Sequence, residues 1–316
     1  MTSVNNPLFP ELEPYHSGHL AVSATHSIYY EECGNADGVP VVVLHGGPGS
    51  GCNPGQRRYF DPAHYRIVLF DQRGCGRSLP LGSTEDNTTQ HLADDMERLR
   101  EHLNIEQWLV FGGSWGSALA LFYASIYKEH VTGLLLRGIF LASPAEIRWF
   151  LYDVQKFFPD AWDAFVAPLS AIERGMILGS YSQRIFKGKP AEAIAAAKSW
   201  NTYEAAIMRL IPDAPSSGVS DEVMVARMRV HLHYLLKDCF LPQPLISQVD
   251  KLRHIPAIIV HGRYDMVCPI QTAYALHRVW PEAELNVIAD AGHAAVEPGT
   301  QAALVAATER FKKLIK

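Results

Sequence analysis

Residues 112–116 read Gly-Gly-Ser-Trp-Gly, a G-x-S-x-G pattern that constrains the fold more than any other feature of the chain. The apolar run at 107–111 predicts a strand before it, and residues 117–127 predict a helix after it. A strand, a sharp turn and a helix make a nucleophile elbow, with the Ser114 hydroxyl at the edge of a sheet. Glycines flank the serine because the turn is strained and its backbone packs closely. The N-terminus of the following helix directs N–H groups to where negative charge would develop.

The remainder of the chain predicts an α/β fold around this turn. Short continuous apolar runs predict strands buried on both faces, as in a parallel sheet; they lie at 40–44, 65–70, 131–136, 255–260 and 285–288. Residues 19–33 alternate and predict an edge hairpin. Helical periodicity covers 89–103, with Asn87 or Thr88 as N-cap, and 299–315. We therefore expect an α/β fold: a mostly parallel central sheet with helices on both faces.

The sequence changes character between residues 142 and 246. This stretch is rich in alanine and aromatic residues at helical spacing, is broken by prolines, and contains no convincing parallel strand. We expect one core domain from residues 1–141 and 247–316, with 142–246 inserted as a helical cap. Long insertions are tolerated in the loops at one end of a sheet, which is also where sites form.

Composition excludes several classes of function. The formal net charge is −5 without a block of like charges, which argues against a nucleic-acid binder and a polybasic membrane anchor. No run approaches the roughly 18 apolar residues of a membrane span, and residues 1–14 lack the apolar segment of a secretory signal. The five cysteines are scattered without C-x-x-C spacing, which speaks against a disulfide framework and zinc. We expect a cytoplasmic protein without a metal or organic cofactor.

Ser114 needs a base and a group that orients the base. Asp265 follows the predicted strand at 255–260, and His293 follows the next one, in the order serine, acid, histidine that this architecture requires. Either residue alone is more often structural than catalytic; the order together with the elbow predicts a triad. Asp290 is the alternative acid, but it lies too near His293 in sequence to reach the far ring nitrogen easily.

The same chemistry requires hydrogen-bond donors for an oxyanion. The glycine-rich turn His45-Gly-Gly-Pro-Gly49 follows an early predicted strand and is of the type that supplies one N–H. Trp115, directly after the nucleophile, supplies the other. A phosphate-binding loop is a poor alternative because the turn lacks the required lysine and Ser/Thr.

Several longer motifs resemble the proline iminopeptidases, serine peptidases of the α/β-hydrolase fold. The similarity covers nearly the whole chain and rests on His45-Gly-Gly-Pro-Gly49, Asp71-Gln-Arg-Gly-Cys-Gly-Arg-Ser78, Asp86-Asn-Thr-Thr89, Gly112-Gly-Ser-Trp-Gly-Ser117, Leu136-Arg-Gly-Ile-Phe140 and His261-Gly-Arg-Tyr-Asp-Met-Val-Cys-Pro269. It implies a Ser114, Asp265 and His293 triad, with an oxyanion hole from Trp115 and Gly47, or Gly46. It also implies release of an N-terminal residue, usually proline, from a small peptide or aminoacyl substrate.

The resemblance also assigns substrate-binding residues. An exopeptidase must bind a cationic amine, and carboxylates do this through charge-assisted hydrogen bonds. The family's glutamate phrase matches Trp200-Asn-Thr-Tyr-Glu204, which makes Glu204 the amine-binding candidate. Phe140 matches a residue of the family's proline pocket. Cys268 lies three residues after Asp265, and we expect it beside the site and sensitive to thiol reagents.

The chain departs from the family at a second glutamate, where His231 stands in the stretch Arg229-Val-His-Leu-His-Tyr-Leu235. Losing one charge-assisted hydrogen bond costs roughly 1.5–3 kcal/mol of binding free energy. We therefore expect a hydrolase that releases N-terminal proline but is less specific for it than the family it resembles. The alternative is a carboxylester or small-amide hydrolase that needs no free amine. A non-catalytic binding protein fits less well, since no triad member is missing. The sequence leaves the oligomeric state open.

Overall fold

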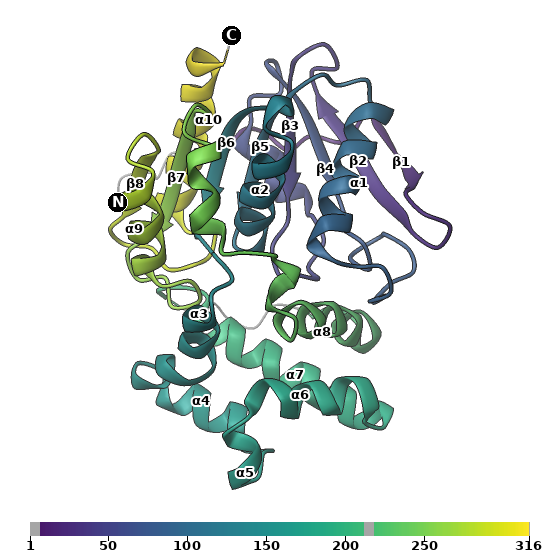
Figure 1. Ribbon diagram of the computed structural model, residues 1–316, viewed down its shortest axis with the longest axis vertical. Coiled ribbons are helices and arrows are strands. Elements are labelled where there is room, and N and C mark those ends of the chain that lie inside the picture. Colours follow the sequence, from purple (N-terminus) through teal and green to yellow (C-terminus); the bar gives the residue numbers. More distant parts are fainter. Residues whose placement is uncertain (1–6, 212–217, 316) are drawn as a thin grey trace.

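The computed structural model describes residues 7–211 and 218–315, and their eight strands form one sheet. The strand order across the sheet is β1-β2-β4-β3-β5-β6-β7-β8 (Figure 1). The strands are β1 (His16–Ala21), β2 (Ser27–Gly34), β3 (Val39–Leu44), β4 (Tyr65–Phe70), β5 (Trp108–Gly113), β6 (Val131–Arg137), β7 (Ala257–Gly262) and β8 (Glu284–Ile288).

The pairing of these strands confirms the predicted mostly parallel sheet. The β1–β2 hairpin and the β2–β4 pair are antiparallel, and every other neighbouring pair is parallel. Alternate residues of β3 enter two separate apolar clusters: Val42 and Leu44 face one side of the sheet, and Val41 and Val43 face the other. Side chains alternate because successive Cβ atoms of a strand point to opposite faces. Apolar residues at every position of a strand therefore mean burial on both faces.

Helices cover both faces of the sheet (Figure 1). One cluster contains side chains of α1 (Thr89–His102), α2 (Trp115–Ile126) and α9 (Ile270–Val279); the other contains those of α10 (Pro298–Leu314). Thr88 caps α1, since its side chain accepts a hydrogen bond from the His91 N–H, as one of the two predicted N-caps. The sequence analysis did not predict α9.

The remaining helices gather at the carboxyl ends of the parallel strands (Figure 1). They are α3 (Pro144–Arg148), α4 (Pro159–Val166), α5 (Ala171–Arg174), α6 (Ile177–Lys187), α7 (Pro190–Ile207) and α8 (Asp221–Leu235), with a π-helical turn at Trp149–Asp153. Residues 212–217 of the predicted cap lie outside the described residues. The division into a core and a cap at 142 and 246 stays a prediction.

Buried aromatic rings hold α4, α6 and α7 together. Phe165 stacks on Tyr203 with ring centroids 4.3 Å apart and on Tyr181 at 4.7 Å. Trp200 meets Phe165 edge to face. Aromatic pairs of this geometry add to the free energy gained by burial alone. This cluster fixes α7, the helix that carries Glu204.

The elbow between β5 and α2 depends on two glycines. A Cβ on Gly112 would overlap the carbonyl oxygen of Gly116, and a Cβ on Gly116 would overlap the carbonyl oxygen of Leu44. The strand, the helix and the end of β3 therefore meet backbone to backbone. Only glycine permits this approach.

We expect Gly116→Ala to lower the free energy of unfolding by about 1–3 kcal/mol, because the new methyl group must displace the end of β3. The matched control is Gly179→Ala within α6, where nothing lies within 4 Å of the added Cβ. That change should stabilise the protein by about 0.5–1 kcal/mol, since alanine favours a helix over glycine. Urea denaturation of both variants measures the difference; equal effects would contradict the proposed crowding.

Candidate active site

Ser114 occupies a strained turn between β5 and α2. Its φ is +58° and its ψ is −125°, a conformation that non-glycine residues rarely adopt. Its N–H donates to the Arg137 carbonyl at 2.8 Å, and its own carbonyl accepts from the Ser117 N–H at 2.8 Å and the Ser117 hydroxyl at 2.7 Å. The turn is thus held from β6 and from the first turn of α2. The predicted elbow is where the sequence placed it.

Asp265 and His293 come together although 28 residues separate them. The His293 Nδ1 donates to Asp265 Oδ2 at 2.7 Å, and Asp265 Oδ1 accepts from the N–H groups of Val267 (3.0 Å) and Cys268 (2.7 Å). Burial opposes ionisation of Asp265, but the adjacent His293 and these N–H groups hold the pKa of the carboxyl below its ordinary value. The alternative acid, Asp290, is exposed.

The other ring nitrogen of His293 is turned toward Arg137. His293 Nε2 lies 3.4 Å from Arg137 Nη1, which also donates to the His293 carbonyl at 2.7 Å. Ser114 and His293 line the same cleft, yet among the described residues no hydrogen bond joins the hydroxyl to the ring. Such bonds are often long in a site without substrate and tighten in the reacting complex. The sequence analysis quoted Arg137 only within a family motif; its place at the end of β6, on the active edge, was the available signal.

The predicted oxyanion loop lies against the nucleophile. A Cβ on Gly46 would lie 3.3 Å from Ser114 Cβ, and Gly47 lines a pocket together with Ser114. Trp115 is the first residue of α2, where N–H groups have no partner within the helix. Both sets of candidate donors therefore border the Ser114 side chain.

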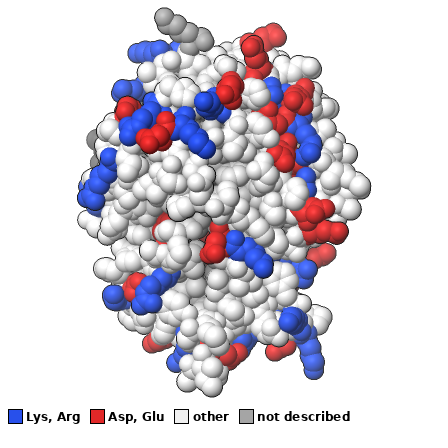
Figure 2. All heavy atoms as spheres, in the orientation of Figure 1, with Lys and Arg blue, Asp and Glu red and all other residues white. Residues whose placement is uncertain are grey.

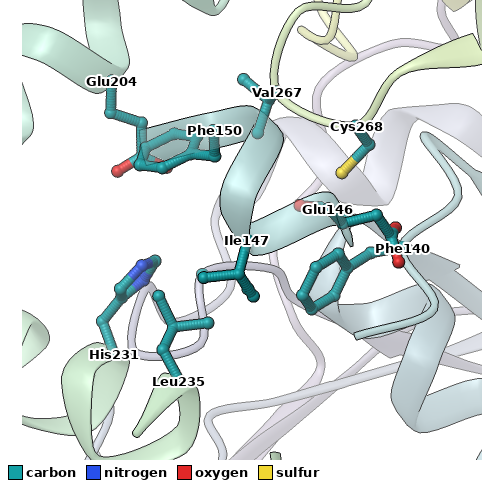
Figure 3. A pocket seen from close by; sticks show the side chains of 11 residues that line it. Phe140, Glu146, Ile147, Phe150, Glu204, His231, Leu235, Val267 and Cys268 are labelled. Atoms are coloured by element: carbon teal, nitrogen blue, oxygen red, sulfur yellow. The ribbon is translucent and has the colours of Figure 1, made fainter. Parts of the chain in front are cut away.

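A pocket with apolar walls opens beside Ser114 (Figure 3). Its apolar side chains are Phe140, Ile147, Phe150, Leu235 and Val267. Glu204 on α7 and His231 on α8 reach into it from two different helices (Figure 3). The structure thus gathers Phe140, Glu204 and His231 around one cavity.

The two polar residues of the pocket titrate in opposite senses because both are desolvated. Burial raises the pKa of Glu204 from its ordinary value of 4.5 to about 7. Burial lowers the pKa of His231 from 6.5 to about 4, although a hydrogen bond to the Pro48 carbonyl opposes the shift. His231 is therefore neutral at physiological pH, with one ring nitrogen committed to the loop 45–49. Among the described residues, the Glu204 carboxyl has no ion-pair or hydrogen-bond partner.

A second pocket acid, Glu146, was missed by the sequence analysis. Its carboxylate accepts hydrogen bonds from the Leu141 N–H (3.0 Å), the Ser143 N–H (2.9 Å) and the Ser143 hydroxyl (2.7 Å). Ser143 and Glu146 form a capping box at the start of α3, and the S-x-x-E spacing could have revealed it. Because these donors occupy its oxygens, Glu146 anchors the entry to the helical region rather than facing a ligand.

Cys268 lies at the nucleophile, as expected. Its buried thiol interacts with the Ser114 side chain, and burial holds its pKa well above the ordinary value. Thiol reagents attack the thiolate, so this cysteine should react slowly. Its sensitivity to such reagents stays a prediction.

The other described residues give no sign of a metal site, a membrane-spanning helix or, on the face shown in Figure 2, a charged docking surface. Acidic and basic side chains are interspersed on the face shown in Figure 2. Within residues 7–211 and 218–315, no three His, Cys, Asp or Glu side chains gather as metal ligands would. None of the described helices has the length and apolar character needed to cross a bilayer.

Comparison with known proteins places the chain in a family. Residues 39–300 match the model of the alpha/beta hydrolase fold. Crystal structures with that fold at low sequence identity include VinJ (TM-score 0.64, 19% identical, covering 96% of this chain and 100% of that one). An esterase from Exiguobacterium antarcticum gives a TM-score of 0.58 at 18% identity, covering 91% and 96%. The chain is therefore an α/β hydrolase.

Curated relatives narrow the assignment. A proline iminopeptidase of Arabidopsis thaliana is 47% identical over 98% of this chain and 83% of its own length. A proline iminopeptidase of Neisseria meningitidis serogroup B is 45% identical over 94% of this chain and 96% of its own length. The chain belongs to the proline iminopeptidase family, which confirms the resemblance inferred from its motifs.

The raised pKa of Glu204 makes a prediction about stability. The folded protein holds this proton more tightly than the unfolded chain, so the carboxyl costs nothing below about pH 4 and destabilises increasingly as the pH rises to about 7. We expect Glu204→Gln to raise the free energy of unfolding at pH 8 by about 1–3 kcal/mol, less than the full shift because the side chain keeps some contact with solvent. At pH 4 the variant should equal the wild type.

Urea denaturation at the two pH values measures this, with Glu222→Gln on the exposed face of α8 as control. A Glu204→Gln protein that is less stable at pH 8 would mean that the carboxylate has a stabilising partner.

Proposed function

We propose that this chain releases N-terminal proline from short peptides through an acyl-enzyme on Ser114. The observation that carries the proposal is that one apolar pocket contains both the elbow serine and an acid without a partner, Glu204. An unpaired, desolvated carboxylate raises the free energy of the folded protein, and a bound cation would offset this cost. The ammonium of an N-terminal residue is such a cation, and the names of the relatives support proline as that residue.

Ser114, His293 and Asp265 are proposed as the reacting triad. His293 Nε2 accepts the Ser114 proton as the hydroxyl attacks the carbonyl carbon, and Asp265 keeps the other ring proton on Nδ1. The oxyanion forms between the N–H groups of Gly47 and Trp115. His293 then protonates the departing amine. Water, deprotonated by the same ring, hydrolyses the acyl-enzyme and releases proline.

The pocket explains why the reaction would stop after one residue. With its carbonyl at Ser114, the substrate places its ring against the apolar walls formed by Phe140 and Phe150. Its ammonium then meets Glu204, which becomes fully ionised when the cation neutralises it. A peptide extended beyond the amine would collide with the α7–α8 side of the pocket.

His231 is proposed as a weaker partner for the same amine. A neutral imidazole accepts a hydrogen bond but contributes no charge, whereas the family resemblance implies a carboxylate at this position. Losing one charged partner weakens binding by roughly 1.5–3 kcal/mol without touching the reacting groups. We therefore expect a less strict requirement for a prolyl ammonium.

A carboxylester or small-amide hydrolase remains the second candidate, and the same triad would serve it. It is disfavoured because such an enzyme has no use for a desolvated acid in its acyl pocket. Action on a small peptide in the cytoplasm, without nucleic-acid or membrane partners, stays a prediction.

The triad assignment is tested by two substitutions. We expect Ser114→Ala to abolish hydrolysis of a prolyl anilide and Asp265→Asn to lower kcat by roughly 10⁴-fold, since the amide would favour the wrong histidine tautomer. Both proteins should retain the wild-type circular dichroism spectrum. Residual turnover by purified Ser114→Ala above the uncatalysed rate would refute the nucleophile.

The amine-binding role of Glu204 is tested with prolyl, alanyl and N-acetylprolyl anilides. We expect Glu204→Gln to raise KM for the prolyl substrate by about 10- to 100-fold with a smaller change in kcat, because it removes a charge-assisted hydrogen bond. Glu222→Gln is again the control and should match the wild type.

Wild-type protein should reject the N-acetylated substrate and accept alanyl and prolyl substrates within about two orders of magnitude of one another. Efficient cleavage of N-acetylprolyl anilide would favour the second candidate. A far stronger preference for free proline would contradict the relaxed specificity ascribed to His231.

A further inference from the structure

Two buried residues outside the triad connect both halves of the proposed oxyanion hole. His45 directly follows β3 and opens the glycine-rich loop, and Gln72 follows β4. Each is about 1% exposed. Gln72 belongs to the motif 71–78, which the proposed function leaves unexplained.

The contacts of Gln72 and Gly46 with the His45 ring favour one of its two neutral tautomers. The Gln72 N–H donates to His45 Nε2 at 3.0 Å, so this nitrogen carries a lone pair and no proton. Burial keeps the ring neutral by lowering its pKa. The single ring proton then sits on Nδ1, which donates to the Gly46 carbonyl at 2.9 Å. The Gly51 N–H also points at Nδ1, at 3.2 Å. A neutral ring accepts from only one of these two N–H groups, and the shorter bond from Gln72 together with the carbonyl acceptor beside Nδ1 favours the proton on Nδ1.

The bond from His45 to the Gly46 carbonyl sets the direction of the next N–H. The peptide between Gly46 and Gly47 is trans, since the cis bond of this loop is the following one. In a trans peptide the carbonyl and the N–H point in opposite directions. Because the carbonyl faces the His45 ring, the Gly47 N–H faces away from it, on the side where Gly46 and Gly47 border Ser114.

The side chain of Gln72 reaches the second donor as well. Its Nε2 donates to the His45 carbonyl at 3.0 Å, and its Oε1 accepts from the Trp115 indole at 2.8 Å. One amide therefore ties the start of the loop to the residue after the nucleophile. All three side chains are buried, which makes these bonds costly to break.

We propose that His45 and Gln72 are positioning residues that orient the Gly47 and Trp115 N–H groups toward the oxyanion. The proposal rests on the Ser114 chemistry of the proposed function. Both side chains are buried, so they would act through the backbone: His45 turns the Gly46–Gly47 peptide, and Gln72 holds His45 and Trp115 in place. Preorganised donors of this kind act in the transition state and not in substrate binding.

The remainder of the loop is anchored independently, so a change at His45 should act locally. The Pro48 carbonyl interacts with His231, and a Cβ on Gly49 would lie 2.6 Å from the Arg227 carbonyl oxygen of α8. These contacts keep the far end of the loop in place when the His45 bond is lost.

Two near-isosteric substitutions separate the two bonds of His45. In His45→Asn the amide nitrogen occupies the place of Nδ1 and can still donate to the Gly46 carbonyl. In His45→Gln the amide oxygen reaches the place of Nε2 and accepts from the Gln72 N–H, but the donor to Gly46 is lost. We expect His45→Gln to lower kcat by about 10- to 100-fold with KM within about threefold of wild type, and His45→Asn to retain most of kcat.

The affinities of two inhibitors distinguish a positioning role of His45 from a purely structural one. The boronic acid analogue of proline forms a tetrahedral adduct on the serine and fills the oxyanion hole, whereas prolinol occupies only the pocket. His45→Gln should weaken the boronate by about the same factor as kcat and leave prolinol unchanged. Equal losses for both inhibitors, equal kcat for the Asn and Gln variants, or a change in KM alone would overturn the proposal.

Gln72→Met supplies an independent test should the His45 variants fail to fold. It keeps the N–H that favours this tautomer but removes both side-chain bonds, so kcat should fall by about tenfold at constant KM. A wild-type kcat would overturn the role of Gln72. If the wild type cleaves p-nitrophenyl acetate but no prolyl anilide, the proposed function fails, while the ester still reports the oxyanion hole.

Discussion

The contact on which the structure depends is the backbone approach of β5, α2 and the end of β3 around Ser114. Gly112 and Gly116 leave no room for a side chain there, and Ser114 adopts a positive φ that only surrounding structure can hold. Strand β6 supplies that hold through the Arg137 carbonyl. Because the turn, the oxyanion loop and the edge of the sheet share this junction, the geometry of the reacting groups and the folding of the core are coupled.

In the pocket, the residue proposed to bind the substrate lowers the stability of the folded protein. Glu204 has no partner in the pocket, and burial raises its pKa, so its ionised form destabilises the folded protein. Glu146 lines the same pocket, but its carboxylate accepts hydrogen bonds from Leu141 and Ser143 and caps α3. The contrast between the two acids distinguishes the binding candidate from the structural one on hydrogen-bond partners alone.

Local patterns predicted most of the fold. The run at 65–70 became β4 with the expected bounds, and Thr88 became the cap of α1. Helix α9 was not predicted because its ten residues bury only Thr272, Ala273 and Leu276, a short apolar stripe that does not indicate a helix on its own. Arg137 was missed for another reason: its place at the end of a predicted strand indicates the active edge, but not the contact with a histidine 156 residues later.

The sequence by itself determined the reaction class and the fold, because the elbow, the order of Ser114, Asp265 and His293, and two-sided apolar strands are local or order-dependent signals. Only the tertiary structure decided the ionisation of the pocket and the direction of the oxyanion-loop peptide. A pKa depends on how much water surrounds a group, and a peptide plane depends on which partners lie on either side of it. The pKa of Glu204 and the orientation of the His45 ring both depend on residues far away in the chain.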